Sequence, residues 1–358
     1  MDKSTRLFAN RMLAENLACI QKYMADPLVE EIMINGEDNV WVIQSGHRMF
    51  KDEGLRITQG QILNIITLLA NLDGKVLKAG TEHCLLDSQI EGFRFAAVLA
   101  PVSRPGHSLC IRKHARTHKN LFQLSEAGLF SPAPENIQIK HHAFPFSRQE
   151  LMGGGEIWIQ MLDWLVKTRR NIFLVGAPGC GKTTLLNALI ERVPDSERVI
   201  TIEDTREVQI RVPNFVSFEA NRAIRLSIQD LVVMSLRYRP SRLVIGEVRS
   251  LEAYEMVSSM NTGLAGCMAS FHANSALDAL SRLERMSQGH PDFPDLQAFQ
   301  NDLGQAKPYI VHLCEGADGA RRIAQVIEVE HFDSQEKKYG IKTIFSGSGE
   351  HGHAAKVA

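Results

Sequence analysis

Hydrophobic and polar positions follow two different patterns along the chain, and the pattern changes near its middle. Residues 5–25 and 58–71 carry apolar side chains at helical spacing. Residues 30–47 predict two strands around a turn at Asn35–Gly36, and further strands are predicted within 89–101 and 108–114. We therefore expect residues 1–130 to form a small α+β domain.

The next segment, residues 131–155, breaks this pattern with three prolines and a run of three glycines, so we expect a linker. Helices and strands then alternate along the chain. The predicted helix, strand, helix and strand cover residues 157–169, 171–176, 183–193 and 198–204. This alternation predicts parallel βαβ units and an α/β domain over residues 156–346. We expect the tail, residues 347–358, to be disordered because it has almost nothing to bury.

One uncharged segment, Met256–Leu277, is long enough to raise the question of a membrane span. It contains Asn, Thr, Ser and Gly residues, and unpaired polar groups are costly in hydrocarbon. We therefore reject the span and interpret the segment as a buried strand and loop that lead to His272.

Composition limits the class of protein. The 358 residues suggest about two domains. A net charge of −1 gives no global attraction to nucleic acid or to anionic lipid. The first residues lack the apolar segment of a secretory signal peptide, and the six cysteines have no metal-ligand spacing. These features favour a reducing, cytoplasmic setting.

Residues 176–184, GAPGCGKTT, match the phosphate-loop pattern G-x-x-x-x-G-K-T and follow an apolar strand. Its backbone N–H groups would surround a phosphate, Lys182 would supply a positive charge, and the Thr183 hydroxyl would bind Mg²⁺. The motif therefore predicts a nucleoside triphosphate site with Mg²⁺ as cofactor. The residues expected to bind the nucleotide and Mg²⁺ are Gly176, Pro178, Gly179, Cys180, Gly181, Lys182, Thr183 and Thr184.

Two later strands end in acidic residues. Glu247 ends the apolar segment at 241–250 and suits the Walker B role, in which a carboxylate holds Mg²⁺ through water or orients the attacking water. Glu203 and Asp204 end the strand at 199–204, where ligands bind in open α/β sheets, although a solvated pair or a helix cap is equally consistent. The sequence leaves open which of Glu203 and Glu247 acts on the water.

Four segments together resemble the secretion ATPase superfamily, which powers type II and type IV secretion and type IV pili. GAPGCGKTT resembles its Walker A box, TIEDTREVQ its Asp box, LRYRPSRLVIGEVRSLEA its Walker B box, and NTGLAGCMASFHANSALDALSRLERM its His box. The N-terminal ADPLVEEIMINGEDNVWV and FRFAAVLAPVSRPGHSLCIRK are also similar. The conjugative and type IV secretion branch is nearest, and tight-adherence pilus ATPases are close.

Two positions depart from the family pattern. Ser270 stands where a Thr is usual. Cys180 lies inside the phosphate loop, so we expect a thiol reagent at Cys180 to block ATP binding.

This resemblance implies a RecA-like ATPase domain, a homohexameric ring, and ATP between the N- and C-terminal domains. It implies that Glu203 is a general base or water-orienting group and that His272 senses the γ-phosphate. It also implies that arginines of the N-terminal domain reach the phosphates, with Arg104 and Arg116 as lesser candidates. The implied catalytic residues are Lys182, Glu203, Glu247, His272, Arg94 and Arg112.

The expected partners are other copies of the chain and the secretion or pilus machinery of the inner membrane, at its cytoplasmic face. The basic residues 107–119 could form a solvated loop, touch anionic lipid or contact a neighbouring protomer. Arg237 and Arg239 could face the nucleotide or the next subunit. We expect no sequence-specific nucleic-acid binding. The alternatives are a pilus assembly ATPase, a RecA-type nucleic-acid translocase, a small-molecule kinase and a non-hydrolysing assembly protein.

Overall fold

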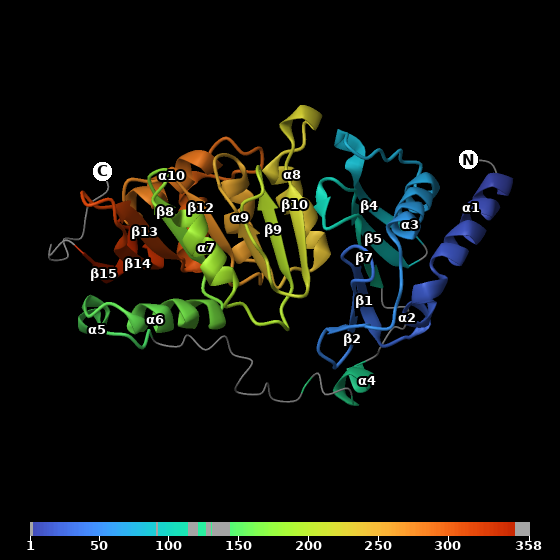
Figure 1. The fold of residues 1–358 in the computed structure, drawn as a ribbon, viewed down its shortest axis with the longest axis horizontal. Coiled ribbons are helices and arrows are strands. Elements are labelled where there is room, and N and C mark those ends of the chain that lie inside the picture. Colours follow the sequence, from blue (N-terminus) through green and yellow to red (C-terminus); the bar gives the residue numbers. More distant parts are fainter. Residues whose placement is uncertain (1–2, 91, 114–120, 127–129, 131–143, 348–358) are drawn as a thin grey trace.

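The computed structural model describes residues 3–90, 92–113, 121–126, 130 and 144–347. In this part of the chain, two sheets lie side by side along the long axis of the molecule (Figure 1). The first half of the sequence forms the smaller sheet and the second half forms most of the larger one.

The smaller sheet has six antiparallel strands in the order β3-β2-β1-β7-β5-β4. Their bounds are β1 Val29–Ile34, β2 Val40–Gln44, β3 Phe50–Lys51, β4 Leu85–Ile90, β5 Phe93–Val98 and β7 Ser108–Lys113. The helices of this half are α1 Lys3–Asn16, η1 Ala18–Ile20, α2 Gln21–Ala25, α3 Gln59–Leu72, η2 Glu82–Cys84 and α4 Leu121–Glu126. Thr58 caps α3, and Ile62, Ile65 and Leu69 of this helix are buried against the sheet.

The larger sheet has nine strands in the order β15-β14-β13-β8-β12-β11-β9-β10-β6. The six strands from β13 to β10 are parallel, as the βαβ pattern predicted. Their bounds are β8 Ile172–Gly176, β9 Val199–Glu203, β10 Phe215–Glu219, β11 Arg242–Ile245, β12 Met268–Phe271 and β13 Tyr309–Glu315. The antiparallel edges are β14 Arg321–Asp333, β15 Lys338–Ser346 and, from the N-terminal half, β6 Ser103–Arg104.

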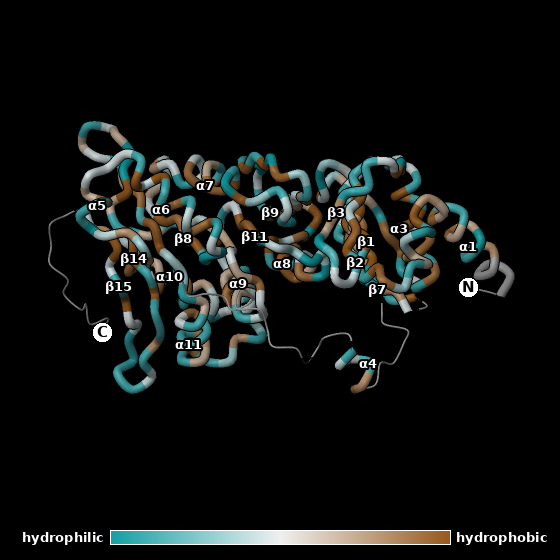
Figure 2. The backbone as a smooth tube through the Cα atoms, turned by 90° about the horizontal axis from the view of Figure 1, so that it is seen from below, coloured by the Kyte–Doolittle hydropathy of each residue, from teal (hydrophilic) through white to brown (hydrophobic). Residues whose placement is uncertain are grey.

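Helices cover both faces of this sheet, and its central strands are hydrophobic (Figure 2). Phe173 and Val175 of β8 pack in one core cluster and Ile172 and Leu174 in the other, because successive side chains point to opposite faces. The helices on the first face are α8 Ile228–Ser235, α9 Glu252–Met260, α10 Ala276–Ser287 and α11 Leu296–Ala306. Those on the second are α5 Arg148–Met152, α6 Glu156–Lys167 and α7 Lys182–Ile190. This half also has two short helices, η3 Arg222–Ile224 and η4 Leu236–Tyr238.

Three sequence predictions need correction. The helix predicted over residues 5–25 is interrupted after Asn16, whose side chain donates to the Met12 carbonyl at 2.8 Å and competes with the helix backbone. The uncharged segment begins inside α9 before it reaches β12, so it is not only strand and loop. Part of the predicted linker is folded, because Phe144 packs edge-to-face on Trp164 and α5 follows. Residues 131–143 and the tail from 348 lie outside the described residues.

The two sheets are joined by a strand pair and by a buried polar network. Arg104 and Ser103 of β6 pair with Ser217 and Phe218 of β10, so the N-terminal half extends the larger sheet.

Arg198 is the centre of the polar network. Its NH1 donates to Asn35 Oδ1 at 2.8 Å and to Asn214 Oδ1 at 2.6 Å, and its Nε donates to the Tyr238 carbonyl at 2.8 Å. The Tyr238 hydroxyl donates to the Ser108 carbonyl at 3.1 Å. All five residues are fully buried, so the two halves are linked through groups that water does not reach.

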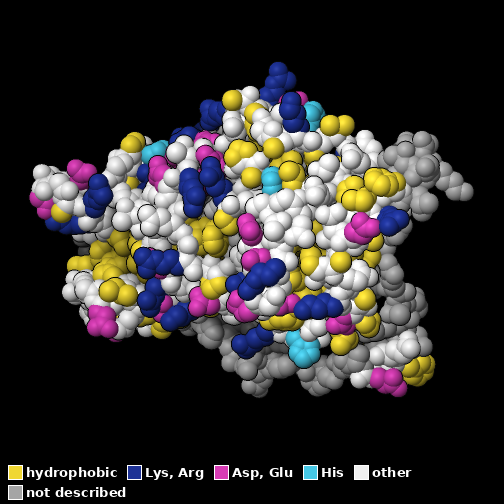
Figure 3. Space-filling view, turned by 45° about the vertical axis from the view of Figure 1, so that its right-hand side comes forward, with side chains coloured by type: hydrophobic (Ala, Val, Ile, Leu, Met, Phe, Trp, Pro, Cys, Tyr) yellow, Lys and Arg dark blue, Asp and Glu magenta, His cyan; other side chains and the backbone are white. Residues whose placement is uncertain are grey.

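On the face shown in Figure 3, basic and acidic side chains are interspersed. This agrees with the net charge near zero and gives that face no continuous basic surface. Among the residues that the structure describes, no helix combines the length and the apolar character needed to span a bilayer.

Candidate functional site

The phosphate loop begins where β8 ends at Gly176 and leads into α7 at Lys182. Gly176 has φ +149°, and a Cβ there would lie 2.3 Å from the Leu313 carbonyl oxygen, so a side chain does not fit. Gly179 and Gly181 also have positive φ, at +78° and +97°. The glycines therefore let the backbone turn tightly at the start of α7, whose exposed N–H groups and dipole favour a phosphate.

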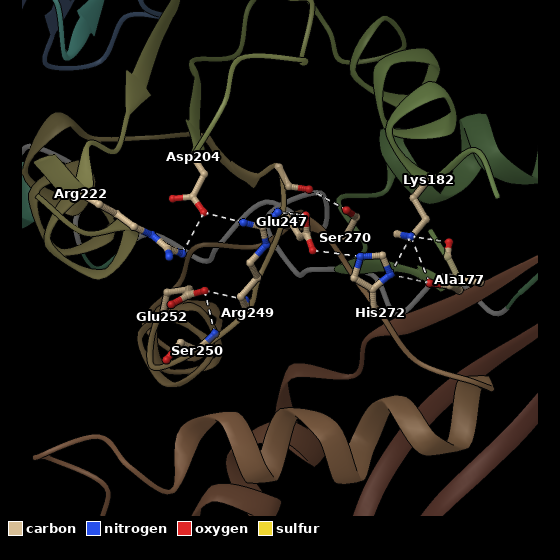
Figure 4. A network of polar contacts seen from close by, with 12 residues as sticks. Ala177, Lys182, Asp204, Arg222, Glu247, Arg249, Ser250, Glu252, Ser270 and His272 are labelled. Carbon is tan, nitrogen blue, oxygen red and sulfur yellow. Dashed lines mark hydrogen bonds and ion pairs between the residues drawn. The ribbon is translucent and has the colours of Figure 1, made fainter. Parts of the chain in front are cut away.

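The Lys182 side chain is largely buried and lies against its own loop. Its ammonium donates to the carbonyls of Gly176 at 3.0 Å and Ala177 at 2.9 Å, and it lies 3.3 Å from Nδ1 of His272. The predicted phosphate-binding cation thus contacts the predicted sensor directly (Figure 4).

A cavity of about 480 Å³ opens beside the loop and brings most of the predicted residues together. The predicted residues that line it are Pro178, Gly179, Gly181, Lys182, Thr183, Thr184, Glu203, Glu247 and His272. Gly176 forms the turn beneath the loop. Cys180 is 1% exposed and packs in the hydrophobic core, so a thiol reagent reaches it only if the loop opens.

Glu203 ends β9 and is 4% exposed. Its Oε1 accepts from the backbone N–H groups of Glu207 and Val208, both at 2.9 Å. Burial raises the pKa of Glu203, and the two N–H groups only partly oppose this effect. A Cβ at Gly246 would lie 2.8 Å from Glu203 Cγ, so glycine at this position leaves room for the carboxylate. A held carboxylate with a raised pKa has the properties of a general base.

Glu247 follows β11 and lies in a different electrostatic environment. Its Oε2 accepts from NH2 of Arg249 at 2.6 Å, and its Oε1 lies 3.1 Å from Nε2 of His272. The hydrogen bond from Arg249 is the main reason that the pKa of Glu247 is lowered. Glu203 and Glu247 are therefore tuned in opposite directions.

Both ring nitrogens of His272 face polar groups. Nε2 faces the Glu247 carboxylate, and Nδ1 lies 3.1 Å from the Gly176 carbonyl as well as near the Lys182 ammonium. Nε2 must carry a proton to bond to a carboxylate. Nδ1 can accept from Lys182 or, when protonated, donate to Gly176, so its protonation selects the partner.

Arg249 was not among the predicted site residues, yet it links two of the motifs. Its NH1 donates to Asp204 Oδ2 at 2.9 Å while its NH2 holds Glu247 (Figure 4). Arg222 lies 3.6 Å from the same Asp204 oxygen. Backbone N–H groups of Arg249 and Ser250 donate to one oxygen of Glu252, which fixes the turn that carries Arg249.

The structure does not bring Arg94 or Arg112 into the cavity beside Lys182. They line a separate pocket of about 240 Å³ together with Arg237. Arg94 forms a bidentate pair with Asp87 at 3.1 and 3.2 Å, and Arg237 lies 3.2 Å from the same carboxylate. Within one chain these arginines lie away from the phosphate loop, because their strands face η4 and α8.

Arg112 pairs with the buried Glu31, and Arg239 lies 3.6 Å from both Glu30 and Glu31. Arg239 thus contacts the N-terminal half of its own chain. Arg104 lines a further cavity, of about 560 Å³, that shares Asp204 and Arg249 with the phosphate cavity. Arg116 lies outside the described residues.

The donor atoms of the cavity fit Mg²⁺ delivered with a nucleotide. Thr183 offers a hydroxyl and Glu247 a carboxylate, and Mg²⁺ prefers such oxygen donors together with waters and phosphates. Across the described ranges, no group of three or more His, Cys, Asp and Glu residues is placed to hold a metal ion. Bound with ATP, Mg²⁺ would neutralise charge on the β- and γ-phosphates.

Known proteins are similar to this chain in sequence and in fold. The sequence profile of the family described as "Type II/IV secretion system protein" matches residues 139–297. The conjugal transfer protein TrbB of Rhizobium radiobacter is 34% identical over 313 residues, which cover 86% of this chain and 85% of that protein. The chain belongs to the type II/IV secretion system family.

Another family member, the type IV secretion system protein VirB11 of Bartonella henselae, is 31% identical over 280 residues, covering 74% of this chain and 78% of that protein. The solved structure of the VirB11 ATPase from the Brucella suis type IV secretion system, in complex with sulphate, covers 90% of this chain with a TM-score of 0.76 at 23% identity. The match covers 96% of the VirB11 chain. The two proteins share the same fold, with a RecA-like P-loop domain. The chain is an ATPase of this family.

Sequence reasoning missed both arginines that line the phosphate cavity of this chain, Arg249 and Arg321. Arg249 follows Glu247 by two residues, which was the available signal. Arg321, at the start of β14, has no motif around it, although its Cδ is 3.3 Å from where a Cβ on Gly181 would lie. Ser270, noted only as a departure, donates to the Gly246 carbonyl at 2.6 Å and joins β12 to the Walker B turn.

Proposed function

We propose that the chain is the ATPase motor of a type IV secretion or conjugal transfer apparatus. The observation that carries this proposal is the cavity in which the phosphate loop, Glu203, Glu247 and His272 converge. The names of its relatives TrbB and VirB11 support the kind of apparatus.

In this proposal the two carboxylates divide the work. Glu203, with its raised pKa and its fixed Oε1, orients and deprotonates the attacking water. Glu247 stays ionised beside Arg249 and holds Mg²⁺ through water, with Thr183 on the other side. Lys182 leaves its backbone carbonyls to bind the β- and γ-phosphates. This assignment chooses between the roles that the sequence left open.

His272 acts as the γ-phosphate sensor. It touches Glu247 through one nitrogen and the phosphate loop through the other. When Lys182 moves towards a phosphate, Nδ1 loses a donor and is free to bond elsewhere. The ring can therefore report the state of the phosphate to the loop that follows β12.

We assign Arg94 and Arg112 to a neighbouring active site in a homohexamer. In one chain they are partly exposed, converge with Arg237, and lie away from their own phosphate loop. Two guanidinium groups at an exposed pocket suit a phosphate presented by another protomer. Arg104, which borders a cavity next to Asp204, would act within its own chain.

The remaining assignments follow from this ring. Residues 1–130 would be the ring-contact domain, 131–155 the hinge, 156–346 the ATPase domain and 347–358 a tail. ATP-driven closure would move these units against membrane-embedded partners, with the ring at the cytoplasmic face of the inner membrane. Residues 107–119 would contact a neighbour or anionic lipid; of these, 114–119 lie outside the described residues.

The experiment that tests the ring is light scattering on Glu247→Gln with and without Mg-ATP. This variant keeps the phosphate loop and slows hydrolysis, so an ATP-bound assembly persists. Six chains of 40.0 kDa give a mass of about 240 kDa. A monomer under both conditions at micromolar protein would contradict the proposal.

A further inference from the structure

A second basic site lies on the outer side of the turn that carries Glu247. The hollow has a volume of about 350 Å³ and lies between that turn and the last turns of α10. We call it the arginine hollow and define it by Arg249, Ser250, Leu251, Arg282, Arg285 and Met286.

Three guanidinium groups line this hollow, and among the residues that the structure describes no Asp or Glu lines it. The structure gives Arg282 and Arg285 no ion pair or hydrogen bond to any described residue, and the Nε of Arg282 is buried without a partner. Arg282 is half-buried and Arg285 is exposed. A buried donor without a partner is unfavourable, and two unpaired guanidinium groups on one helix attract negative charge, so the site favours an anion.

Nearby carboxylates do not pair with the two arginines of α10, Arg282 and Arg285. Glu284, although on the same helix, accepts from Gln300 at 2.9 Å and from the Tyr339 hydroxyl at 2.8 Å. Glu252 accepts from two backbone N–H groups, and Glu255 lies 2.9 Å from Nε2 of His290. These acids are therefore held by other donors. Since Arg249 is paired with Glu247 and Asp204, the positive charge that stays uncompensated in the hollow is that of Arg282 and Arg285.

The shape of the hollow indicates what kind of anion it takes. Arg282 and Arg285 are three residues apart on α10, so their Cβ atoms are about 5–6 Å apart on one face. Alternate side chains of an extended peptide are about 6.6 Å apart, which matches this spacing. Leu251 and Met286 add apolar wall beside the arginines, which suits the hydrocarbon part of a peptide and not a single inorganic ion.

We infer that the arginine hollow docks an acidic segment of a partner protein, with at least two carboxylates on Arg282 and Arg285. This inference rests on the proposed function in that the partner would belong to the secretion machinery. Arg249 borders both the hollow and the phosphate cavity and holds Glu247. A docked segment would therefore contact the turn that positions a catalytic carboxylate.

The test measures binding of a fluorescently labelled octaglutamate peptide to the full chain. Fluorescence anisotropy gives the Kd at low and at physiological salt. Mg-ATPγS is kept saturating so that the phosphate cavity is filled. The double variant R282Q/R285Q should weaken binding by about tenfold or more, since each lost charge-assisted bond costs on the order of a factor of ten. The matched control R48Q removes an exposed arginine elsewhere and should change the Kd by less than about twofold.

Several results would overturn the inference. Equal affinity in R282Q/R285Q and wild type would place the peptide elsewhere. Peptide binding that is absent with saturating Mg-ATPγS and appears only when the nucleotide is left out would place the peptide in the phosphate cavity. Displacement by a few millimolar inorganic phosphate would indicate a simple anion site. Thermal melting and ATP binding of the double variant show whether it is folded. Peptide binding does not need hydrolysis, so failure here is distinct from failure of the proposed ATPase.

Discussion

Nε2 of His272 lies 3.1 Å from Oε1 of Glu247, so the predicted sensor and the predicted Walker B carboxylate are in direct contact. The same ring reaches the phosphate loop through Nδ1, 3.1 Å from the Gly176 carbonyl. A histidine that bonds to two separate parts of one site can couple them, because a change at one nitrogen alters the bond at the other.

Replacing His272 tests this coupling. His272→Ala removes a bond that orients Glu247 but no phosphate ligand, so we expect turnover to fall roughly ten- to hundredfold. The Kd for ATP should change by less than about threefold, since Lys182 and the loop glycines remain. Phosphate release and binding of a fluorescent ATP analogue measure the two effects. Equal losses in binding and turnover would show that His272 is a ligand and not a sensor.

Arg249 is predicted to position Glu247. Arg249→Gln should lower kcat by about tenfold or more while ATP binding persists, because the carboxylate loses its 2.6 Å partner. Without Arg249 the pKa of Glu247 returns towards its ordinary value, still below the raised pKa of Glu203, so the acid limb of the pH–rate profile should not move. Arg222→Gln is the control, since Arg222 is exposed and reaches only Asp204. A full loss of ATP binding in Arg249→Gln would point to a structural role instead.

The sequence was sufficient to predict the parts of the site that depend on the order of strands, loops and helices along the chain. The phosphate loop follows a buried strand and opens a helix, and the acids Glu203 and Glu247 end two parallel strands, so all three meet at one edge of the sheet. Periodicity likewise predicted α3, α6 and the central strands.

Contacts between distant segments were not predictable in this way. Arg249 and Arg321 join the site through side chains that extend across strands, and no spacing rule specifies such a contact. The packing of the two halves, which takes Arg94 and Arg112 away from the phosphate loop, depends on the network around Arg198. The local sequence around each residue of that network does not indicate that these residues contact one another.

Complementation can show in which chain Arg112 acts. Arg112→Ala and Lys182→Ala should each lose most turnover, since an arginine at the γ-phosphate contributes about 10³–10⁵ in rate. If Arg112 acts on a neighbour, a mixed ring contains sites with an intact loop and an intact arginine from different chains. An equal mixture should then recover activity at about a quarter of its sites. No recovery, in rings confirmed to be mixed, would show that Arg112 acts at the phosphate loop of its own chain or would remove Arg112 from the mechanism.

Arg198 is predicted to hold the two halves of the chain together. Arg198→Ala leaves the buried Oδ1 of Asn35 without its donor and removes one of the two donors to Oδ1 of Asn214, which should lower the free energy of unfolding by about 2–4 kcal/mol. Urea denaturation measures the loss, with the exposed Arg225→Ala as control. A change within about 0.5 kcal/mol would show that the network does not stabilise the fold.

The raised pKa of Glu203 makes a prediction about stability. Since burial favours the protonated form in the folded state, ionisation of Glu203 opposes folding, and its destabilising effect grows as pH rises from 4.5 through the folded pKa. Glu203→Gln has no charge to bury and can still accept the N–H bonds. Its melting temperature at pH 7 should therefore equal or exceed that of the wild type, with a smaller difference near pH 4. A clearly lower value at pH 7 would contradict the assigned pKa direction.

The most direct test of the account is ATP hydrolysis by Glu203→Gln, measured beside Glu247→Gln and the wild type with ATP binding followed in parallel. We predict that Glu203→Gln binds ATP with a Kd within about threefold of wild type and hydrolyses it at least about a hundredfold more slowly, because the base is gone and the phosphate loop is intact. If Glu203→Gln instead keeps more than half of the wild-type turnover while Glu247→Gln loses it, Glu203 is not the group that acts on the water.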